Sequence, residues 1–257
     1  MLYLPGNGTL HRLHPLTKLV GALLVAVAVT LYPRPPLLLG ALALLVLVAL
    51  TTGVARRLFV IALGLLLPLV VSLFLIQGVL FPPAGAVAFA TFGPFRLTYE
   101  GLLFAALIAG RLLTIAIALL LVLLTTHPAD LVAALTGAGL PRSVGYALLV
   151  ALQIAPDMVA RAGAILDAQQ SRGLAVGRGI ARLRALPALV GPLLVGALGD
   201  VEERAMAIEA RAFLGSGPKS SLRVLHDSAV QRGARWFMLV LMLALIVLRV
   251  VGLRGPV

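Results

Sequence analysis

The chain has 257 residues, of which 61% are hydrophobic and only 12% charged, with a mean hydropathy of +1.10. Soluble domains are about half apolar and about a quarter charged, so this composition excludes a soluble globular domain and predicts a polytopic membrane protein. We attribute the net charge of +12 to Lys and Arg residues that keep loops on the cytoplasmic side, rather than to a surface that binds nucleic acid. The absence of cysteine excludes disulfides and thiolate metal sites.

Residues 1–17 form a polar entry that ends in His14-Pro15-Leu16-Thr17-Lys18, a proline-bounded helix start that carries positive charge. Two apolar runs follow, at 19–31 and 37–50, and the prolines between them prevent one continuous helix. At about 1.5 Å per residue, each run needs a few flanking residues to cross a core of roughly 30 Å. We therefore expect a hairpin of two short spans, and no removable signal peptide, because no small-residue cleavage site follows the first run.

A third span is expected over 58–80, and a loop rich in proline, glycine and aromatic residues over 81–98. A fourth span runs over 101–124. Arg111 lies midway along it, where a charge costs about 2.5 to 3.5 kcal/mol on insertion scales. We therefore expect Arg111 to face protein or water. Two environments stay open for it: the two long helices further along the chain, or backbone carbonyl groups.

The string Thr125-Thr126-His127-Pro128-Ala129-Asp130-Leu131 closes the fourth span. A threonine at the cap and a proline in the first turn predict that a short helix starts there.

The stretch from 140 to 215 predicts two long helices, over 140–173 and from about 186 to 215. Gln153, Asp157 and Arg161 recur every four residues on the first helix, and Asp200, Arg204, Ala207 and Arg211 share a face of the second. Pro156 removes a backbone hydrogen bond inside the first helix and predicts a bend. Such amphipathic helices need either a membrane surface or a partner.

Each long helix ends in a small-Arg-small tripeptide, Ser171-Arg172-Gly173 in the first and Ala210-Arg211-Ala212 in the second. Taken alone, Ser171-Arg172-Gly173 is equally consistent with an ordinary helix end, where a cation faces the negative end of the dipole and glycine takes a left-handed conformation. Ala210-Arg211-Ala212 taken alone is equally consistent with a routine exposed Arg on a helix. Taken together, the small flanking residues let a partner approach closely and the guanidinium offers a planar fork to a carboxylate. The pair therefore predicts docking into an acidic groove.

A polar segment over 216–235 and a last span over 236–251 complete the chain. The distribution of Lys and Arg favours five spans with the N-terminus in the cytoplasm and the C-terminus outside, in the inner or plasma membrane. A seven-span alternative would make both long helices cross the membrane. It would place Arg172, Arg178, Arg182 and Arg184 together on the outside, against the charge rule.

No catalytic group, metal site or cofactor is expected in this chain. The segment 215–221 has proline before its lysine and lacks the earlier glycine of a P-loop, so no ATP site is expected. The four histidines are scattered in the sequence, and His11 and His14 have no third ligand near them, which favours a surface role over metal binding. No carboxylate lies inside an early span, which argues against a proton relay.

At this point the sequence resembles the transmembrane T component of energy-coupling factor ABC transporters, known as EcfT and, in cobalt systems, CbiQ. The resemblance is carried by the start His14–Lys18, by the string Thr125–Leu131, and by the regions 168–173 and 209–215. In that family the terminal residues of two long coupling helices dock into two ABC ATPases. The resemblance implies this role for Ser171, Arg172, Gly173, Ala210, Arg211 and Ala212. Ser171 and Ala212 depart from the usual Ala and Gly but stay small.

The resemblance implies an all-α membrane subunit with about five spans and two cytoplasmic-side coupling helices. It would transmit ATP-driven movement of two ATPases to a small substrate-binding S component in the bilayer, for uptake of a vitamin or transition-metal ion. ATP and Mg would be bound by the ATPases, and no nucleic acid is involved. We divide the chain into 1–125 (membrane), 126–215 (coupling) and 216–257 (connector and last span). Possible coupling residues are Arg111, Pro156, Asp157, Arg161 and Arg204.

Two alternatives stay open. A stand-alone secondary transporter would be expected to show broken helices and polar midplane residues in corresponding halves. A lipid-modifying membrane enzyme would turn over its substrate without ATPases.

Overall fold

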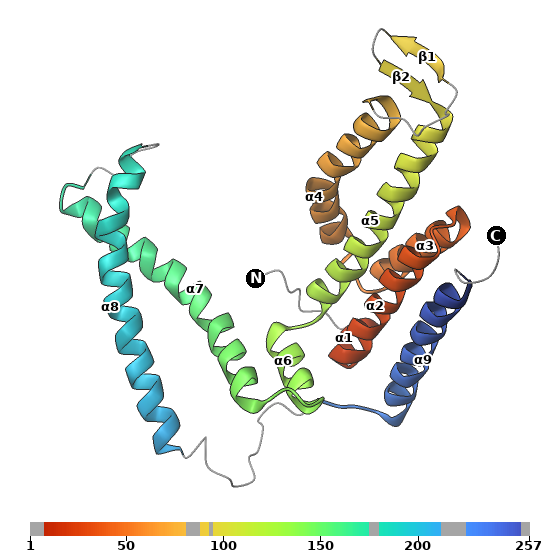
Figure 1. Ribbon diagram of the computed structural model, residues 1–257. Coiled ribbons are helices and arrows are strands. Elements are labelled where there is room, and N and C mark those ends of the chain that lie inside the picture. The colour runs from red at the N-terminus through yellow and green to blue at the C-terminus, as the bar shows by residue number, and fades with distance from the viewer. Residues whose placement is uncertain (1–7, 81–87, 93–94, 175–179, 212–224, 253–257) are drawn as a thin grey trace. The chain divides into compact units, whose positions relative to one another are not determined.

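The computed structural model describes residues 8–80, 88–92, 95–174, 180–211 and 225–252 (Figure 1). The chain divides into two compact units. Unit 1 comprises Met1–Gly139 with Leu225–Val257, and unit 2 comprises Leu140–Val224. Nearly all of the described residues are helical, so the predicted all-α fold class is confirmed.

Unit 1 is a bundle in which one long central helix, α5, packs against three others, α2, α3 and α4. Proline starts three of its helices, a position where the missing N–H removes no helical hydrogen bond. The helices of unit 1 are α1 (Thr9–Arg12), α2 (Pro15–Leu31), α3 (Pro35–Thr51), α4 (Ala55–Leu75), the π-helical turn η1 (Ile76–Leu80), α5 (Tyr99–Thr125), α6 (Pro128–Gly137) and α9 (Ala229–Gly252).

The core of unit 1 combines small and large apolar side chains on facing helices. Alanines on α2, α3, α4 and α5 are buried, and they allow close approach of the helices around the fully buried Leu58 and Leu124. Most other large apolar residues of α3 and α4 are exposed, as on helices whose outer face meets lipid. The bundle is therefore packed inside and apolar outside.

The last helix, α9, lies alongside α2 (Figure 1). None of its residues is buried, and Trp236, Phe237 and several aliphatic side chains are exposed. At its far end, the hydroxyl of Tyr32 donates to the carbonyl oxygen of Leu245 at 3.4 Å. The helix is held on one side only, and its apolar outer face is suited to lipid or a membrane partner.

Within the part of the chain that the structure describes, five helices are long and apolar enough to cross a membrane: α3, α4 with its π-helical extension, α5, α7 (Arg142–Ser171) and α9. The predicted spans over 37–50, 58–80, 101–124 and 236–251 are thus matched by helices. The predicted span over 19–31 corresponds to α2, which has 17 residues and is shorter than the five. By length and composition α7 also qualifies, although it is the least apolar of the five.

The segment before α5 differs from the expected loop. Strands β1 (Ala88–Phe92) and β2 (Phe95–Thr98) pair as an antiparallel hairpin. Phenylalanine and threonine, which favour strands, occur in both segments. The sequence therefore contained a local preference for strands, but the neighbouring Pro and Gly led to the expectation of a loop. The hairpin leads directly into Tyr99, where α5 begins.

At the start of α5 the backbone lies very close to its neighbours. A β-carbon at Gly101 would lie 2.6 Å from the Oγ1 of Thr98 and 2.7 Å from the carbonyl oxygen of Gln77. The Thr98 hydroxyl also accepts the backbone N–H of Gly101 at 3.2 Å and caps the helix. Glycine is required here because it brings η1 against α5.

Unit 2 consists of α7 (Arg142–Ser171) and α8 (Ile180–Ala210), which pack against each other as a hairpin (Figure 1). The first long helix matches its predicted range closely. The second begins at Ile180 rather than at about 186, because the residues before Leu186 are good helix formers and Pro187 and Pro192 are accommodated inside the helix. Among the described side chains of this unit only Gly145 is buried, and many large apolar ones are exposed.

Candidate functional site

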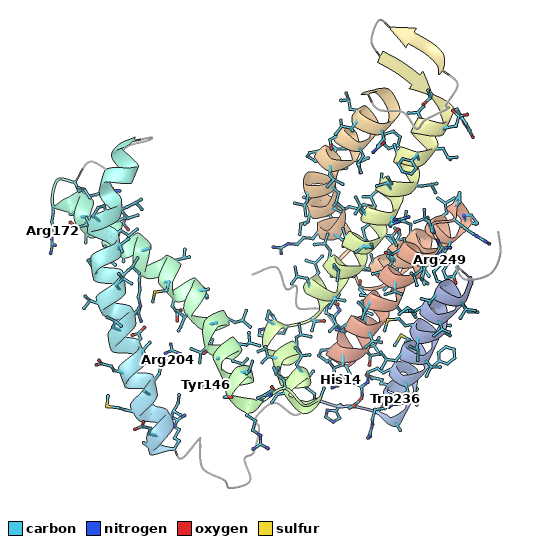
Figure 2. The ribbon with its side chains drawn as sticks, viewed as in Figure 1. His14, Tyr146, Arg172, Arg204, Trp236 and Arg249 are labelled. Carbon is cyan, nitrogen blue, oxygen red and sulfur yellow. The ribbon has the colours of Figure 1, made fainter. Side chains whose placement is uncertain are left out.

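The first docking tripeptide forms a complete helix stop at the end of α7. The N–H of Leu174 donates to the carbonyl oxygen of Gln169 at 3.0 Å, and that of Gly173 donates to Gln170 at 2.9 Å. Gly173 has a φ of +89°, so this is a Schellman motif, in which glycine takes the left-handed position. The motif uses only backbone groups. The exposed side chain of Arg172 (Figure 2) is therefore not needed to end the helix.

The second tripeptide lies at the end of α8. Ala210 is the last helical residue, and the N–H of Arg211 donates to the carbonyl oxygen of Ala207 at 3.3 Å. Arg211 is exposed. Ala212 lies outside the described residues, as does the segment 215–221 in which the sequence showed no P-loop.

The two arginines are far apart within unit 2. Arg172 follows α7 at the closed end of the hairpin, whereas Arg211 follows the last residue of α8. A helix of 31 residues is about 46 Å long at 1.5 Å per residue. The two candidate docking residues thus follow opposite ends of the helix hairpin.

Among the described side chains, one ion pair joins the long helices. The Nη1 of Arg161 lies 2.9 Å from the Oδ2 of Asp200, with side chains 45% and 23% exposed. The sequence placed each residue on a polar face but did not pair them. Because the pair is half-exposed, it orients the two helices more than it stabilises them.

The other possible coupling residues are not gathered around this pair. Pro156 lies inside a continuous α7, and Asp157 beside it is exposed. Arg204 is partly exposed on α8, one turn beyond Asp200. In unit 1 the Nε of Arg111 is buried and has no hydrogen-bond partner among the described residues. The structure thus shows no carbonyl bonded to that nitrogen.

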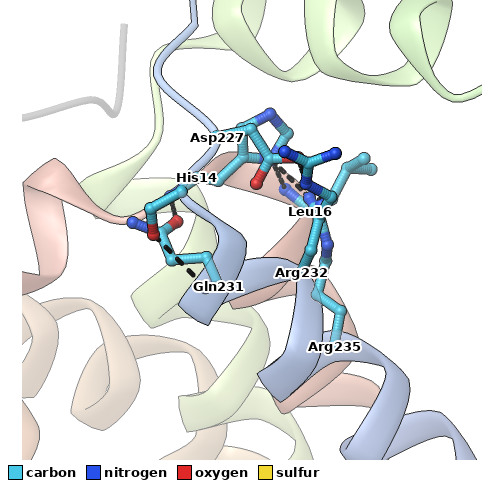
Figure 3. Close-up of polar contacts among 7 residues, drawn as sticks. His14, Leu16, Asp227, Gln231, Arg232 and Arg235 are labelled. Carbon is cyan, nitrogen blue, oxygen red and sulfur yellow. Dashed lines mark hydrogen bonds and ion pairs between the residues drawn. The ribbon is translucent and has the colours of Figure 1, made fainter.

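A polar cluster that the sequence did not predict lies in unit 1, where α2 and α9 both begin (Figure 3). The N–H of His14 donates to the Oε1 of Gln231 at 2.7 Å, and the Nη1 of Arg235 lies 2.9 Å from the Nδ1 of His14. The Nη2 of Arg235 donates to the carboxylate of Asp227 at 2.5 Å. More than 200 residues separate His14 from its partners, so no local pattern reveals the cluster. It fastens the start of the last helix to the start of the first span.

Burial lowers the pKa of His14 from its ordinary value of 6.5, with Asp227 opposing this shift and Arg235 adding to it. The hydrogen bond from Arg235 lowers the pKa of Asp227 from 3.8. Both shifts favour the unprotonated group in the folded state, so both contributions to stability are complete at high pH. That of His14 is lost as pH falls below 6.5 towards its lowered pKa, and that of Asp227 only below 3.8.

We therefore expect the melting temperature of the wild-type chain in detergent to fall between pH 7 and pH 5, and the His14→Asn variant to lose less over the same interval. Asparagine can still cap α2 but does not titrate. His226→Asn, which changes an exposed histidine in the connector, should keep the wild-type slope. If the melting temperature falls equally with pH in wild type and in His14→Asn, the protonation of His14 does not contribute to the loss of stability between pH 7 and pH 5.

The four histidines, scattered in the sequence, all line one cavity of about 220 Å³. The surface role expected for His14 is wrong, because only 7% of this residue is exposed.

The prediction that a threonine caps α6 is also wrong. The N-cap is His127, whose Nδ1 accepts the N–H of Ala129 at 3.2 Å, while Thr125 bonds back to Leu121 within α5. Among the described residues, no three His, Asp or Glu side chains are placed to hold a metal ion.

Comparison with known proteins adds an independent observation. A family model described as CbiQ, cobalt transport protein, matches residues 6–222. The energy-coupling factor transporter transmembrane protein EcfT of Heliobacterium modesticaldum is 32% identical over 87% of this chain and 86% of its own length. EcfT of Thermosediminibacter oceani is 28% identical over 90% of each. The chain belongs to the CbiQ/EcfT family.

A third relative is of another kind. A putative ABC transporter ATP-binding protein of Bifidobacterium longum is 27% identical to this T component over 90% of the chain, which covers only 30% of that protein.

Two of the family-like strings of this T component meet in unit 1. The Nζ of Lys18, in the string that starts α2, donates to the carbonyl oxygen of Thr125, in the string that ends α5, at 2.9 Å. Lys18 is only 8% exposed. The bond ties the first span to the central helix at the same end as the histidine-lined cavity.

Proposed function

We propose that this T component transmits ATP-driven movement from two ABC ATPases to a small substrate-binding subunit in the membrane, for inward transport of a vitamin or a transition-metal ion. The observation that supports the proposal best is the pair of exposed arginines, Arg172 and Arg211, each directly after a long helix, with the 31 residues of α8, about 46 Å long, between them in the chain. Each offers a planar fork to a carboxylate. Ser171, Gly173, Ala210 and Ala212 flank them with little bulk.

The family comparisons support the same proposal. The relatives named EcfT are named as transmembrane proteins of energy-coupling factor transporters. In the Bifidobacterium relative, a segment similar to this chain is part of a protein named as ATP-binding. The ATP and Mg of the working complex are proposed to be bound by the partner ATPases.

The experiment is purification of the tagged chain from its native host in a mild detergent. We expect two ATPase subunits and a small hydrophobic subunit to be recovered with it, with ATP hydrolysis that depends on the ATPases. A chain that transports substrate alone in vesicles, or that turns over a lipid without ATPases, would replace the proposal with one of the two alternatives.

The proposed orientation places both docking tripeptides in the cytoplasm, together with the N-terminus. Because the chain contains no cysteine, a single cysteine introduced as Ser171→Cys can be labelled selectively. A membrane-impermeant thiol reagent should label it in inside-out vesicles and not in intact cells. Labelling from outside intact cells would contradict the orientation.

A further inference from the structure

The histidine-lined cavity lies where α2 and α6 begin and α5 ends. His11, His14, His127 and His226 line it together with Lys18, Thr125, Thr126 and Asp130. All of these residues belong to unit 1, so the cavity does not depend on unit 2. Nothing in the energy-coupling role proposed above uses it.

Two helices begin at this cavity in the same way. His14-Pro15 starts α2 and His127-Pro128 starts α6, and each histidine accepts the N–H two residues ahead through Nδ1, at 3.3 and 3.2 Å. The Nδ1 of His14 also lies 2.9 Å from the Nη1 of Arg235 and accepts, so a neutral His14 ring carries its proton on Nε2 and offers a donor rather than a metal-binding lone pair. Helix N-termini also attract negative charge. The cavity is therefore suited to an oxyanion and not to a metal ion.

Two more donors at the cavity are buried. Lys18 carries a buried ammonium group, which donates to the carbonyl oxygens of Thr125 at 2.9 Å and, more weakly, His11 at 3.5 Å, leaving a third N–H. Thr126 is only 5% exposed, and its Oγ1 has no hydrogen-bond partner among the described residues. A buried hydroxyl without a partner is costly, which indicates that a ligand satisfies it. Asp130 also lines the cavity, and its charge interacts with that of Lys18 and balances part of it.

An apolar cavity of about 360 Å³ adjoins the polar one. It shares Leu13, Lys18 and Thr125 with the polar cavity and is otherwise lined mainly by aliphatic residues of α2, α3 and α5, with Met238 of α9. Thr17, whose Oγ1 is likewise buried without a partner, lies at its polar end. A ligand that fits both cavities has an anionic head and an apolar tail.

We propose that the two cavities form a site for one glycerophospholipid, with its phosphate group among the donors of Lys18, Thr126 and His14 and one acyl chain in the apolar cavity beside Val25. A bilayer supplies this molecule at high concentration, and the adjoining apolar cavity distinguishes it from free phosphate. The lipid would fill the space between the first span, the central helix and α9. The site then acts as a lipid-dependent stabiliser of unit 1.

The test uses the full chain, purified in detergent and depleted of lipid. Dioleoylphosphatidylglycerol is added, with dioleoylglycerol as the tail without phosphate and glycerol phosphate as the head without tails. We expect the phospholipid to raise the melting temperature by about 5 °C or more near saturation, and neither partial ligand to reach a third of that shift. An equal shift with glycerol phosphate would indicate a free-phosphate site, and an equal shift with dioleoylglycerol a nonspecific apolar groove. Either result overturns the proposal.

Two variants test the head and tail positions separately. Thr126→Val removes the unpartnered hydroxyl at nearly constant volume, so the lipid-free melting temperature should stay equal or rise while the phospholipid shift falls at least twofold. Val25→Phe fills the apolar cavity and should reduce the shift similarly. Thr136→Val on α6 and Leu23→Phe on the exposed face of α2 are the matched controls and should respond as wild type. Wild-type shifts in both test variants would overturn the site, as would a lower lipid-free melting temperature in Thr126→Val, because the hydroxyl would then already have a protein partner.

Discussion

The double variant Arg172→Ala/Arg211→Ala is expected to lose both ATPase recovery and substrate uptake, and each single variant to lose a large part of both. Removing one partner of a buried charge pair costs about 2 to 5 kcal/mol, which corresponds to about 30-fold or more in affinity. Since the two arginines are separated by the length of α8, their losses should add. The measurement is the amount of ATPase recovered with the purified chain, together with uptake in cells.

The structure makes Arg172→Ala a clean substitution. The Schellman motif that ends α7 depends on the backbone of Gln169, Gln170, Gly173 and Leu174, and Arg172 itself is exposed, so α7 should keep its length. Arg172→Lys keeps the charge but loses the planar fork, and should fall between wild type and Arg172→Ala. Arg249→Ala, at an exposed position in the last turn of α9, is the matched control and should leave ATPase recovery unchanged. Wild-type recovery from the double variant would remove the docking role from both residues.

Gly101→Ala is expected to destabilise unit 1 strongly. The added methyl group would lie 2.6 Å from Thr98 Oγ1 and 2.7 Å from the carbonyl oxygen of Gln77, distances at which something must move. The hydroxyl can rotate only by giving up its cap, and the carbonyl belongs to the backbone of the π-helical turn. Overpacking of this kind costs about 1 to 3 kcal/mol, or about 2 to 10 °C in melting temperature for a chain of this size.

Gly110→Ala in the same helix is the control for Gly101→Ala. There the nearest atom to an added β-carbon is the Cδ1 of Leu38 at 3.8 Å, an ordinary contact. Because alanine favours a helix over glycine by about 1 kcal/mol, this variant should be neutral or slightly more stable. Thermal unfolding of both variants in the same detergent measures the difference. If Gly101→Ala and Gly110→Ala have the same melting temperature, then η1 and α5 leave room for a methyl group at position 101 in the native protein.

Much of the architecture follows from local sequence. Apolar runs of sufficient length, separated by proline and charge, predicted α3, α4, α5 and α9, because a helix satisfies its backbone within one segment. The two long helices followed from their polar stripes and their ends. The predicted start of α8, at about residue 186, is six residues late, because helix formers continue back to Ile180.

The polar side chains of unit 1 show why the rest could not be predicted. His14 meets Gln231 and Arg235, and Lys18 meets Thr125, across separations of more than 100 residues that no periodicity encodes. One signal was nevertheless present. The dipeptide His-Pro occurs at 14–15 and again at 127–128, each before a helix, and both capping histidines line the same cavity. The repeated capping pattern suggests that the two histidines have similar surroundings, and the structure supports this because α2 and α6 begin at the same cavity.

The length of α8 restricts how unit 2 can lie at a membrane. The helix is about 46 Å long, whereas the hydrocarbon core of a bilayer is about 30 Å thick. If both Arg172 and Arg211 meet partners on one side of the membrane, as proposed, α8 cannot cross the bilayer between them. In the proposed complex, a relative movement of the two partners would then tilt or shift α8 as one rigid helix on that side of the membrane.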